Sequence, residues 1–360
     1  MTDSEKLNNL AEQIKDWGNN LGFQQVAIAK PDLENASENL KSWLRQGFNG
    51  SMNWMSEHGD KRYTVDKLVD NTTRVISVRM NYLSDKNMIA VLKDDNKAYI
   101  SRYALGRDYH KLIRKRLAKL VSLIEREIPS LKLSQRPFVD SAPVMEKPLA
   151  EQAGLGWIGK NTLLLNDQAG SWFFLGEIYT SLELPTDQSA QIDRCGNCRA
   201  CLSICPTNAF PKPYVLDARK CISYLTIEHK EAIPEELRPL MGNRVFGCDD
   251  CQIICPWNRF SSLTTEDDFS PRHNLEGAEL ATLFRWSEEE FLTNTEGSAI
   301  RRIGYQRWLR NLAIGLGNAS GSRETLSALQ TRAEHPSTLV RETVQWALSQ
   351  QQEKTTREKG

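Results

Sequence analysis

The cysteines are the feature that most limits how this chain can fold. All eight lie within residues 195–255, and the rest of the 360-residue sequence contains none. Disulfides of a secreted scaffold would be spread along the chain, so this clustering favours reduced thiols that hold a metal or redox centre. The first run reads Cys195-x2-Cys198-x2-Cys201-x3-Cys205-Pro206. This is the spacing with which bacterial ferredoxins hold 4Fe-4S clusters.

The second run has one ligand fewer. It reads Cys248-x2-Cys251-x3-Cys255-Pro256, with Val245 where a fourth cysteine would stand, and Cys221 is the thiol left to complete the set. In two-cluster ferredoxins the cysteine before proline ligates the other cluster. The same crossing predicts one cluster on Cys195, Cys198, Cys201 and Cys255, and a second on Cys205, Cys221, Cys248 and Cys251. Structural zinc is the alternative, although it favours CxxC pairs separated by a longer spacer.

Length and charge set broader limits. A chain of 360 residues suggests two or three domains, and the cysteine module needs only about residues 190–260. The 46 basic and 46 acidic side chains balance, so any site for a polyanion must be a local patch. No apolar stretch approaches the roughly 18 residues that cross a bilayer, and the start lacks the apolar centre of a signal peptide. We therefore expect a cytoplasmic protein.

Hydrophobic periodicity predicts a mixed α/β N-terminal half. We expect strands near residues 26–29, 73–80, 136–140 and 171–180, the last of them buried because it is almost continuously apolar. We expect helices near residues 1–18, 40–44 and 109–127. After the cysteines, helices at about 300–316 and 337–350 predict one HEAT-type hairpin that packs on the body. On the first of these, Arg307 and Arg310 are expected to project away from the buried face.

A glycine-rich segment at residues 154–161 (GLGWIGKN) matches GxGxxG and comes close to a P-loop. The Rossmann fingerprint needs a strand directly before it, whereas residues 147–153 favour a helix, and a P-loop needs Ser or Thr where Asn161 stands. A backbone wall beside a flat ligand and an ordinary turn are the better interpretations.

Two acidic segments carry open alternatives. Asp108-Tyr109-His110 begins like the D-x-H-x-x-G cobalamin signature, but Ile113 replaces its glycine, and His110 alone predicts a half-exposed helix residue. Asp140 ends an apolar segment before Ser-Ala-Pro, which fits an Asx turn, a helix cap or an acid at the mouth of a pocket. The basic residues of 101–120, with Arg301, Arg302, Arg307 and Arg310, form either a solvated face or a track for a phosphate backbone.

Five segments together resemble the epoxyqueuosine reductase family, which is related to reductive dehalogenases. They are SRYALGRDYHK (101–111), FVDSAPVMEKPLAEQAGLGWIGKNTLLL (138–165), GSWFFLGEI (170–178), KCISYLTIEHK (220–230) and RRIGYQRWLRNLAIGLGN (301–318). The resemblance covers about residues 5–350. It implies an enzyme that reduces epoxyqueuosine to queuosine at the wobble position of tRNA, using cobalamin and two 4Fe-4S clusters.

The resemblance also implies an architecture. We expect an α+β protein with a cobalamin-binding α/β domain at 1–188 and a ferredoxin-like two-cluster domain at 189–265. A HEAT-like helical region would follow at 266–350, and a frayed tail at 351–360. Partners would be the anticodon loop of tRNA and a flavodoxin or ferredoxin as electron donor, with no membrane and a monomeric chain.

Site residues follow from the same likeness. Asp140 would donate the proton that leaves with the epoxide oxygen, either because burial beside the corrinoid and apolar residues raises its pKa or because it is recharged from solvent within each turnover. Base-off cobalamin would be contacted by Arg62, Tyr103, Asp140, Leu164, Ser171 and Ser223. Three alternatives remain: a dehalogenase-like reductase of small molecules, a ferredoxin-type electron carrier, and a binding module with merely structural clusters.

Overall fold

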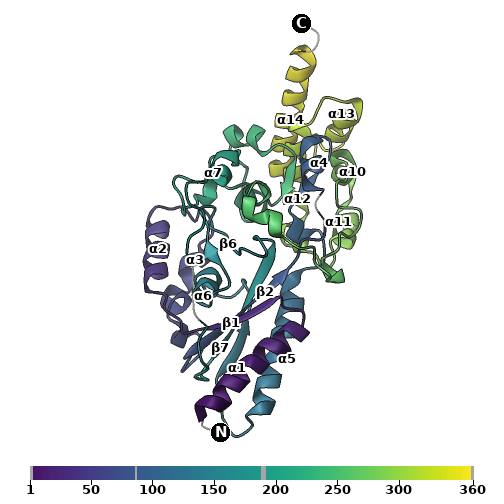
Figure 1. Ribbon diagram of the computed structural model, residues 1–360. Coiled ribbons are helices and arrows are strands. Elements are labelled where there is room, and N and C mark those ends of the chain that lie inside the picture. Colours follow the sequence, from purple (N-terminus) through teal and green to yellow (C-terminus); the bar gives the residue numbers. More distant parts are fainter. Residues whose placement is uncertain (1–2, 86, 188–191, 358–360) are drawn as a thin grey trace.

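A four-stranded antiparallel sheet forms the lower half of the molecule (Figure 1). The computed structural model describes residues 3–85, 87–187 and 192–357. The strand order is β1-β2-β7-β4, with the bounds Gln25–Ala29, Arg74–Asn81, Phe173–Thr180 and Gln135–Phe138 respectively. The two central strands are buried along almost their whole length because helices cover both faces of the sheet. The expected strands, including the buried one at 171–180, are confirmed.

Helices α1 (Asp3–Asn20) and α5 (Tyr109–Glu127) cover one face of this sheet. α5 places a row of apolar side chains at helical spacing against the strands, namely Ile113, Leu117, Leu120 and Ile124. Gly176 of β7 permits this close approach, because a Cβ there would lie 3.0 Å from both Ile113 and Leu117. The opposite face carries α6 (Glu146–Gln152), which packs on β1, β2 and β7. The helix at 109–127 is therefore confirmed to the residue.

Three shorter helices belong to the N-terminal part of the chain: α2 at Glu34–Arg45, α3 at Trp54–Glu57 and α4 at Met88–Lys93, the last of which lies beside the C-terminal helices (Figure 1). Two short strands, β5 (Trp157–Ile158) and β6 (Leu164–Leu165), form a separate hairpin from the glycine-rich segment. The residues before it form α6 rather than a strand, which excludes the Rossmann interpretation. A Cβ on Gly156 would lie 2.1 Å from the Leu165 carbonyl oxygen, so glycine is required for the hairpin to close.

The cysteine region is joined to the N-terminal part by backbone pairing. Its strand β8 (Arg244–Phe246) runs parallel to β3 (Tyr99–Ile100). Its helices are α7 (Ala200–Ile204), α8 (Ile222–Ile227) and α9 (Asp250–Ile253). The buried carboxylate of Asp249 accepts hydrogen bonds from the Tyr99 hydroxyl at 2.8 Å and the Arg102 amide at 2.9 Å. The domain boundary expected between residues 188 and 189 lies outside the described residues.

The C-terminal part is helical. Its elements are α10 (Leu280–Arg285), α11 (Glu288–Asn294), α12 (Gly304–Asn318), α13 (Arg323–Gln330) and α14 (Thr338–Arg357). α12 packs against both α14 and β8, so the pair expected from the sequence does rest on the body. Helix α13, which lies between α12 and α14 in the sequence, was not predicted. Among the described residues no helix is both long and apolar enough to cross a membrane.

Two expectations about this region are wrong. The part of the tail at 351–357 continues α14, and 358–360 lie outside the described residues. Gln351 is fully buried and donates to the Leu316 carbonyl at 2.7 Å and the Ala319 carbonyl at 3.0 Å, which anchors the helix on the end of α12. Arg310 does not project outward either. It is also fully buried, and its guanidinium donates to the carbonyls of Leu225, His229 and Glu231.

Candidate active site

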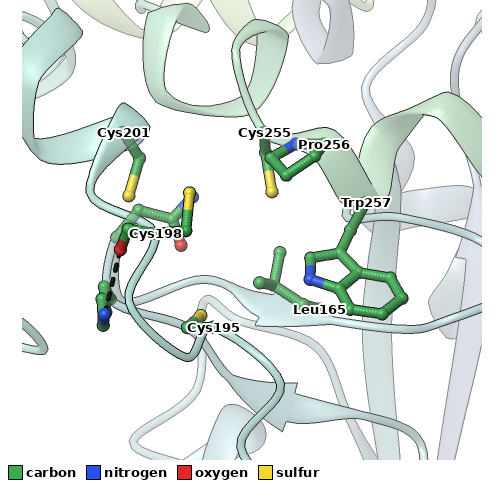
Figure 2. A pocket seen from close by; sticks show the side chains of 9 residues that line it. Leu165, Cys195, Cys198, Cys201, Cys255, Pro256 and Trp257 are labelled. Atoms are coloured by element: carbon green, nitrogen blue, oxygen red, sulfur yellow. Dashed lines mark hydrogen bonds between the residues drawn. The ribbon is translucent and has the colours of Figure 1, made fainter.

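Four of the eight thiols surround one cavity beside the β5–β6 hairpin (Figure 2). They are Cys195, Cys198, Cys201 and Cys255, which is the first set predicted by the crossed ferredoxin pattern. The cavity encloses roughly 330 Å³ of empty space, and Leu165, Pro256 and Trp257 supply apolar walls. Cys198 is exposed, so this set lies at the surface. Lys160 donates to the carbonyl of Cys198 at 2.9 Å and holds the loop in place.

The other four thiols also lie near one another. Burial first, and then the charges of Cys221, Asp249, Cys201 and Cys205, raise the pKa of the Cys251 thiol well above its ordinary value. Burial, the Asp250 carboxylate and the neighbouring Cys251 do the same for Cys248. These interactions place the four thiols of the second predicted set, Cys205, Cys221, Cys248 and Cys251, near one another. All four of its members are partly covered, whereas Cys198 of the first set is exposed.

Among residues 3–85, 87–187 and 192–357, no three His, Cys, Asp or Glu side chains are grouped so that they could hold a single metal ion. Burial and the neighbouring thiols raise the pKa of Cys201 to about 11. Thiolates gathered in this way need compensating positive charge, which iron supplies when ligands deprotonate on binding.

A second cavity opens between the sheet and helix α6. This groove, of about 470 Å³, has an apolar floor of Leu163, Leu164, Phe173, Phe174 and Leu175. Its polar residues are Tyr109, Asp140, Glu146, Lys147 and Ser171. Three of the predicted site residues, Asp140, Leu164 and Ser171, therefore line one groove although they are far apart in the sequence.

The β5–β6 hairpin forms a shared wall between the two cavities. Leu165 faces the thiols, whereas its neighbour Leu164 lines the groove, as expected from the alternation of side chains along a strand. Ser171 of the groove also accepts a hydrogen bond from Gln252, the residue after Cys251, at 3.2 Å. The glycine-rich segment thus forms a backbone wall, but it lies between two sites rather than beside one.

Asp140 is held by two side chains from the start of α5. His110 Nε2 lies 2.6 Å from Asp140 Oδ1, and the Tyr109 hydroxyl donates to Oδ2. Partial burial would raise the pKa of Asp140, but the hydrogen bond and charge of His110 outweigh it, and the pKa lies below its ordinary value. Burial thus acts on the pKa of Asp140 in the expected direction, but the ion pair with His110 more than offsets it. Its side chain is 38% exposed, and an ion pair takes the place of an apolar pocket.

His110 is the more informative partner. His110 is a residue of helix α5, as expected, but its side chain is only 13% exposed and links two carboxylates. Its Nδ1 lies 2.5 Å from Oδ1 of Asp108, the residue that caps α5. Burial lowers the pKa of His110, but Asp108 and Asp140 raise it further, to about 9. The proton of this pair therefore rests on His110 at neutral pH, next to Asp140.

Three expected cofactor contacts do not line the groove. Arg62 is buried and donates to the Trp54 carbonyl at 3.2 Å, and its Nε has no partner. The ring of Tyr103 contacts those of Tyr109 and Phe174, which do line the groove, at centroid distances of 6.3 and 6.5 Å. Ser223 lies in α8, two residues after Cys221, where its hydrogen bond lowers the pKa of a thiol that burial raises.

Sequence reasoning missed several groups near Asp140. Tyr109, Glu146 and Lys147 line the groove, and the carboxyl of Glu177 interacts with both Glu146 and Asp140. The signal for Glu177 was available, because it is the one charged residue in the apolar strand β7. For Tyr109 and His110, the signs were the incomplete D-x-H-x-x-G pattern and the start of a helix directly after Asp108.

The four C-terminal arginines do not act as one track. Arg310 is buried, and Arg307 donates to the Ile227 carbonyl at 2.9 Å. Arg301 lines a hollow beside Glu288, Glu289 and Glu296. Arg302 is exposed, and its charge acts on Asp140, Asp108 and Tyr103. Arg302 is therefore the arginine of this group that stands by the mouth of the groove.

The chain matches two family models. One, described as "4Fe-4S double cluster binding domain", matches residues 194–258, and the other, "Epoxyqueuosine reductase QueG, DUF1730", matches residues 62–141. The chain is 61% identical over 340 residues to the epoxyqueuosine reductase of Pseudomonas aeruginosa, covering 94% of each chain. It is 56% identical over 356 residues to that of Escherichia coli, covering 98% of this chain and 93% of the relative.

Solved structures share the fold. A selenomethionine-labelled epoxyqueuosine reductase superposes with a TM-score of 0.85 at 25% identity, covering 95% of this chain and 90% of the other. An epoxyqueuosine reductase with an epoxyqueuosine-modified stem loop of tRNA-Tyr has a TM-score of 0.81 at 24% identity, with the same coverage. The mixed helix and strand architecture is thus that of these enzymes.

Proposed function

This chain belongs to the epoxyqueuosine reductase family and reduces epoxyqueuosine to queuosine, and from that premise we propose how its residues divide the work. The eight thiols hold two iron-sulfur clusters, the groove holds cobalamin, and Asp140 with His110 handles the proton. The observation that carries this proposal is the placement of the thiol cavity and the Asp140 groove on opposite sides of one short hairpin.

The thiols divide into an outer and an inner set. Cys195, Cys198, Cys201 and Cys255 would hold the outer cluster, since they surround one cavity and Cys198 is exposed. Cys205, Cys221, Cys248 and Cys251 would hold the inner cluster. Each 4Fe-4S cluster, when bound, carries one electron at a time. Lys160 and the exposed Arg199 border the outer set, which suits an acidic donor such as a flavodoxin or ferredoxin.

The lining of the groove suits one face of a flat macrocycle with polar edges. Its floor is apolar and includes two phenylalanines, whereas polar side chains gather at its rim. Cobalamin bound there would supply low-potential cobalt chemistry for the reduction of the epoxide. Leu164, Ser171 and Asp140 are its contacts in this proposal, because they line the groove. Arg62, Tyr103 and Ser223 lie outside its lining and are proposed on family resemblance alone.

Asp140 would deliver a proton to the departing epoxide oxygen. Expelling oxide or hydroxide without a proton is costly near neutral pH, so an acid in reach of the substrate is needed. Asp140 is ionised at rest because His110 and Tyr109 stabilise the carboxylate. His110 carries the proton that recharges it, and Asp108 fixes the orientation of the imidazole. This arrangement corresponds to recharging within each turnover.

The substrate would be tRNA, as in the solved complex with a modified stem loop. Phosphates are expected to be bound by exposed cations near the groove, and unpaired bases by stacking and hydrogen bonds. Arg302 is the first candidate, since it is exposed and its charge acts on Asp140. We further propose a monomeric chain, with a ferredoxin-like cluster region and a HEAT-like arrangement of α12 and α14.

The test is single-turnover reduction of an epoxyqueuosine-containing stem loop by the reconstituted protein. Asp140→Asn should retain iron, sulfide and cobalamin yet react about 10²- to 10⁴-fold more slowly, the usual contribution of a positioned acid. Asp70→Asn is the matched control, because Asp70 is exposed and outside the groove. A variant Asp140→Asn that reacts at the parent rate would remove Asp140 from this role.

A further inference from the structure

Strand β7 buries a carboxyl group that the proposed mechanism does not use. Glu177 is 0% exposed, and neither of its carboxyl oxygens has a hydrogen-bond partner among the described residues. It lies on the α6 face of the sheet, between Leu175 and Tyr179 of two apolar clusters. Ser77, its cross-strand partner on β2, is also fully buried with a hydroxyl that lacks a partner. A carboxyl group in such a place is held in its neutral, protonated form.

This buried acid is connected to the groove. On its other side Glu177 pairs with Phe138, and Asp140 follows two residues later. Helix α6 covers the same face and begins with Glu146, which lines the groove and makes no hydrogen bond or ion pair within the described part of the chain. Burial first, and then Glu146 and Asp140, raise the pKa of Glu177 well above its ordinary value. Burial and Asp140 raise the pKa of Glu146 to about 7.

No cation of the described residues forms an ion pair with Glu146 or Glu177, although the charges of Lys147 and His110 lower the pKa of Glu146. Lys147 adjoins Glu146, but its ammonium donates to the Thr162 carbonyl at 2.8 Å. Arg79, the charged residue nearest to Ser77 on the same face of β2, donates to Gln25 and Asn81. β1 contributes only Ala27 opposite Ser77. Burial and the mutual repulsion of these three carboxyls favour a protonated Glu177 and a partly protonated Glu146, whereas His110 stabilises the carboxylate of Asp140.

The reaction needs more than one proton. When both carbon–oxygen bonds of the epoxide break and a carbon–carbon double bond forms, two electrons and two protons are consumed and the oxygen leaves as water. The electrons come from a low-potential one-electron donor through the clusters. The pair of His110 and Asp140 holds a single proton at a time, so the second must come either from solvent or from another acid in the groove.

We propose that Glu146 supplies the second proton and that Glu177 stores the proton that recharges it. This inference rests on the proposed function and deepens it. Glu146 lines the groove directly, whereas Glu177 lies behind it and acts through Glu146 as a positioning residue. Glu177 lies on the face of the sheet opposite α5, so it is not part of the hydrogen-bonded row of Asp108, His110 and Asp140.

The experiment compares Glu177→Gln, Glu177→Asp and Glu146→Gln in the full reconstituted enzyme. Infrared spectroscopy of the parent at pH 7 should show the carbonyl stretch of protonated carboxyl groups, and Glu177→Gln should lose one such band. In single turnover Glu177→Gln should react about tenfold or more slowly while iron and cobalamin contents stay at the parent level, and Glu177→Asp should recover part of the rate. Glu146→Gln should be slower than Glu177→Gln.

Glu151→Gln is the control, because Glu151 lies on the same helix, but its carboxylate accepts from the Ile158 amide outside the groove. It should react at the parent rate. A parent without the protonated band, or a Glu177→Gln variant that loses the band yet reacts at the parent rate, overturns the inference and leaves the proposed function standing. If Glu177→Gln does not fold, a Glu146→Gln variant with the parent rate overturns it equally. A parent that cannot reduce the stem loop overturns the proposed function itself.

Discussion

The thiol cavity and the Asp140 groove share one wall but are built in different ways. The first set of thiols comes from two short runs, and its members are fixed by the spacing of cysteines within a few residues. The groove is assembled from the start of α5, the turn after β4, the start of α6, β6 and β7. The proposed cluster ligands can thus be identified from the local sequence, whereas the acidic residues of the groove come together only when the sheet has formed.

This difference has a functional consequence. Because the cavities lie on opposite sides of the β5–β6 hairpin, changes to thiols should affect iron and leave the acids intact. Changes to the acids should affect proton delivery and leave iron intact. Single substitutions on each side of the hairpin test that separation.

The largest effect is expected from Cys255→Ala. Without one of its four ligands the outer cluster should no longer bind. The iron and sulfide contents should then fall to those of one cluster, and turnover should become undetectable. Cobalamin binding should persist, because the groove does not include Cys255. Metal analysis beside the absorption spectrum checks both statements. Unchanged iron would contradict the ligand assignment, and loss of cobalamin would show that the two sites are not separate.

His110→Gln should reduce the single-turnover rate about 10²-fold, because Asp140 loses its proton source. The parent rate should fall as pH rises through about 9, where His110 loses its proton, and the variant should lack this limb. The stability of the folded state should change with pH in the same direction as the rate. A pKa raised from 6.5 stabilises the folded state fully below pH 6.5, and this contribution is lost as pH approaches about 9.

Rates and thermal unfolding between pH 6 and about 10 check the His110 prediction. His58→Gln is the control, since His58 is exposed and lies outside the groove. A variant His110→Gln with the same alkaline limb as the parent would mean that another group titrates there.

The two arginines of the C-terminal part should separate stability from substrate binding. Arg310→Ala leaves three carbonyls without their buried donor, so unfolding should become easier by about 3 kcal/mol. Arg302→Ala should leave stability unchanged and weaken tRNA binding, with a salt slope shallower by about 0.7 to 0.9 if one phosphate contact is lost. Chemical denaturation and binding titrations at several salt concentrations measure these effects. An unchanged slope would return Arg302 to the solvated surface.

The smallest effect is expected at the tail. Gln351→Ala removes hydrogen bonds to the carbonyls that end α12, and should lower the unfolding free energy by about 1 kcal/mol. Gln352→Ala, one residue on and exposed, is the control. Equal stability of the two variants would mean that α14 is held by its apolar contacts alone.

Much of the fold was predictable because apolar periodicity reports burial directly. The helix at Tyr109–Glu127 and the buried strand near Phe173–Thr180 follow from runs with one consistent period. Periodicity failed for Arg310, because α12 is covered on two sides, by α14 and by the cysteine region. A charged residue on a helix face that is predicted to be exposed gives no sign that another part of the protein covers that face.

Some residues of the site could be predicted from the sequence, and others could not. The four thiols around the outer cavity follow from ligand spacing, and Asp140, Leu164 and Ser171 entered through family resemblance. The pairing of His110 with Asp140 was out of reach, because these residues meet only when α5 packs against β4. Glu177 was detectable as a charge within an apolar strand, but its neighbours Ser77 and Glu146 come from strand register and helix packing.

The central claim is that one chain holds two iron-sulfur clusters and a cobalamin on either side of a short hairpin. Metal analysis and electron paramagnetic resonance of the protein reconstituted with iron, sulfide and cobalamin test it most directly. The account predicts two 4Fe-4S clusters and one base-off cob(II)alamin signal per chain, the latter lost when Leu164→Arg fills the groove and the former kept. Zinc in the thiol sites, or a cobalamin signal unchanged by Leu164→Arg, would contradict it.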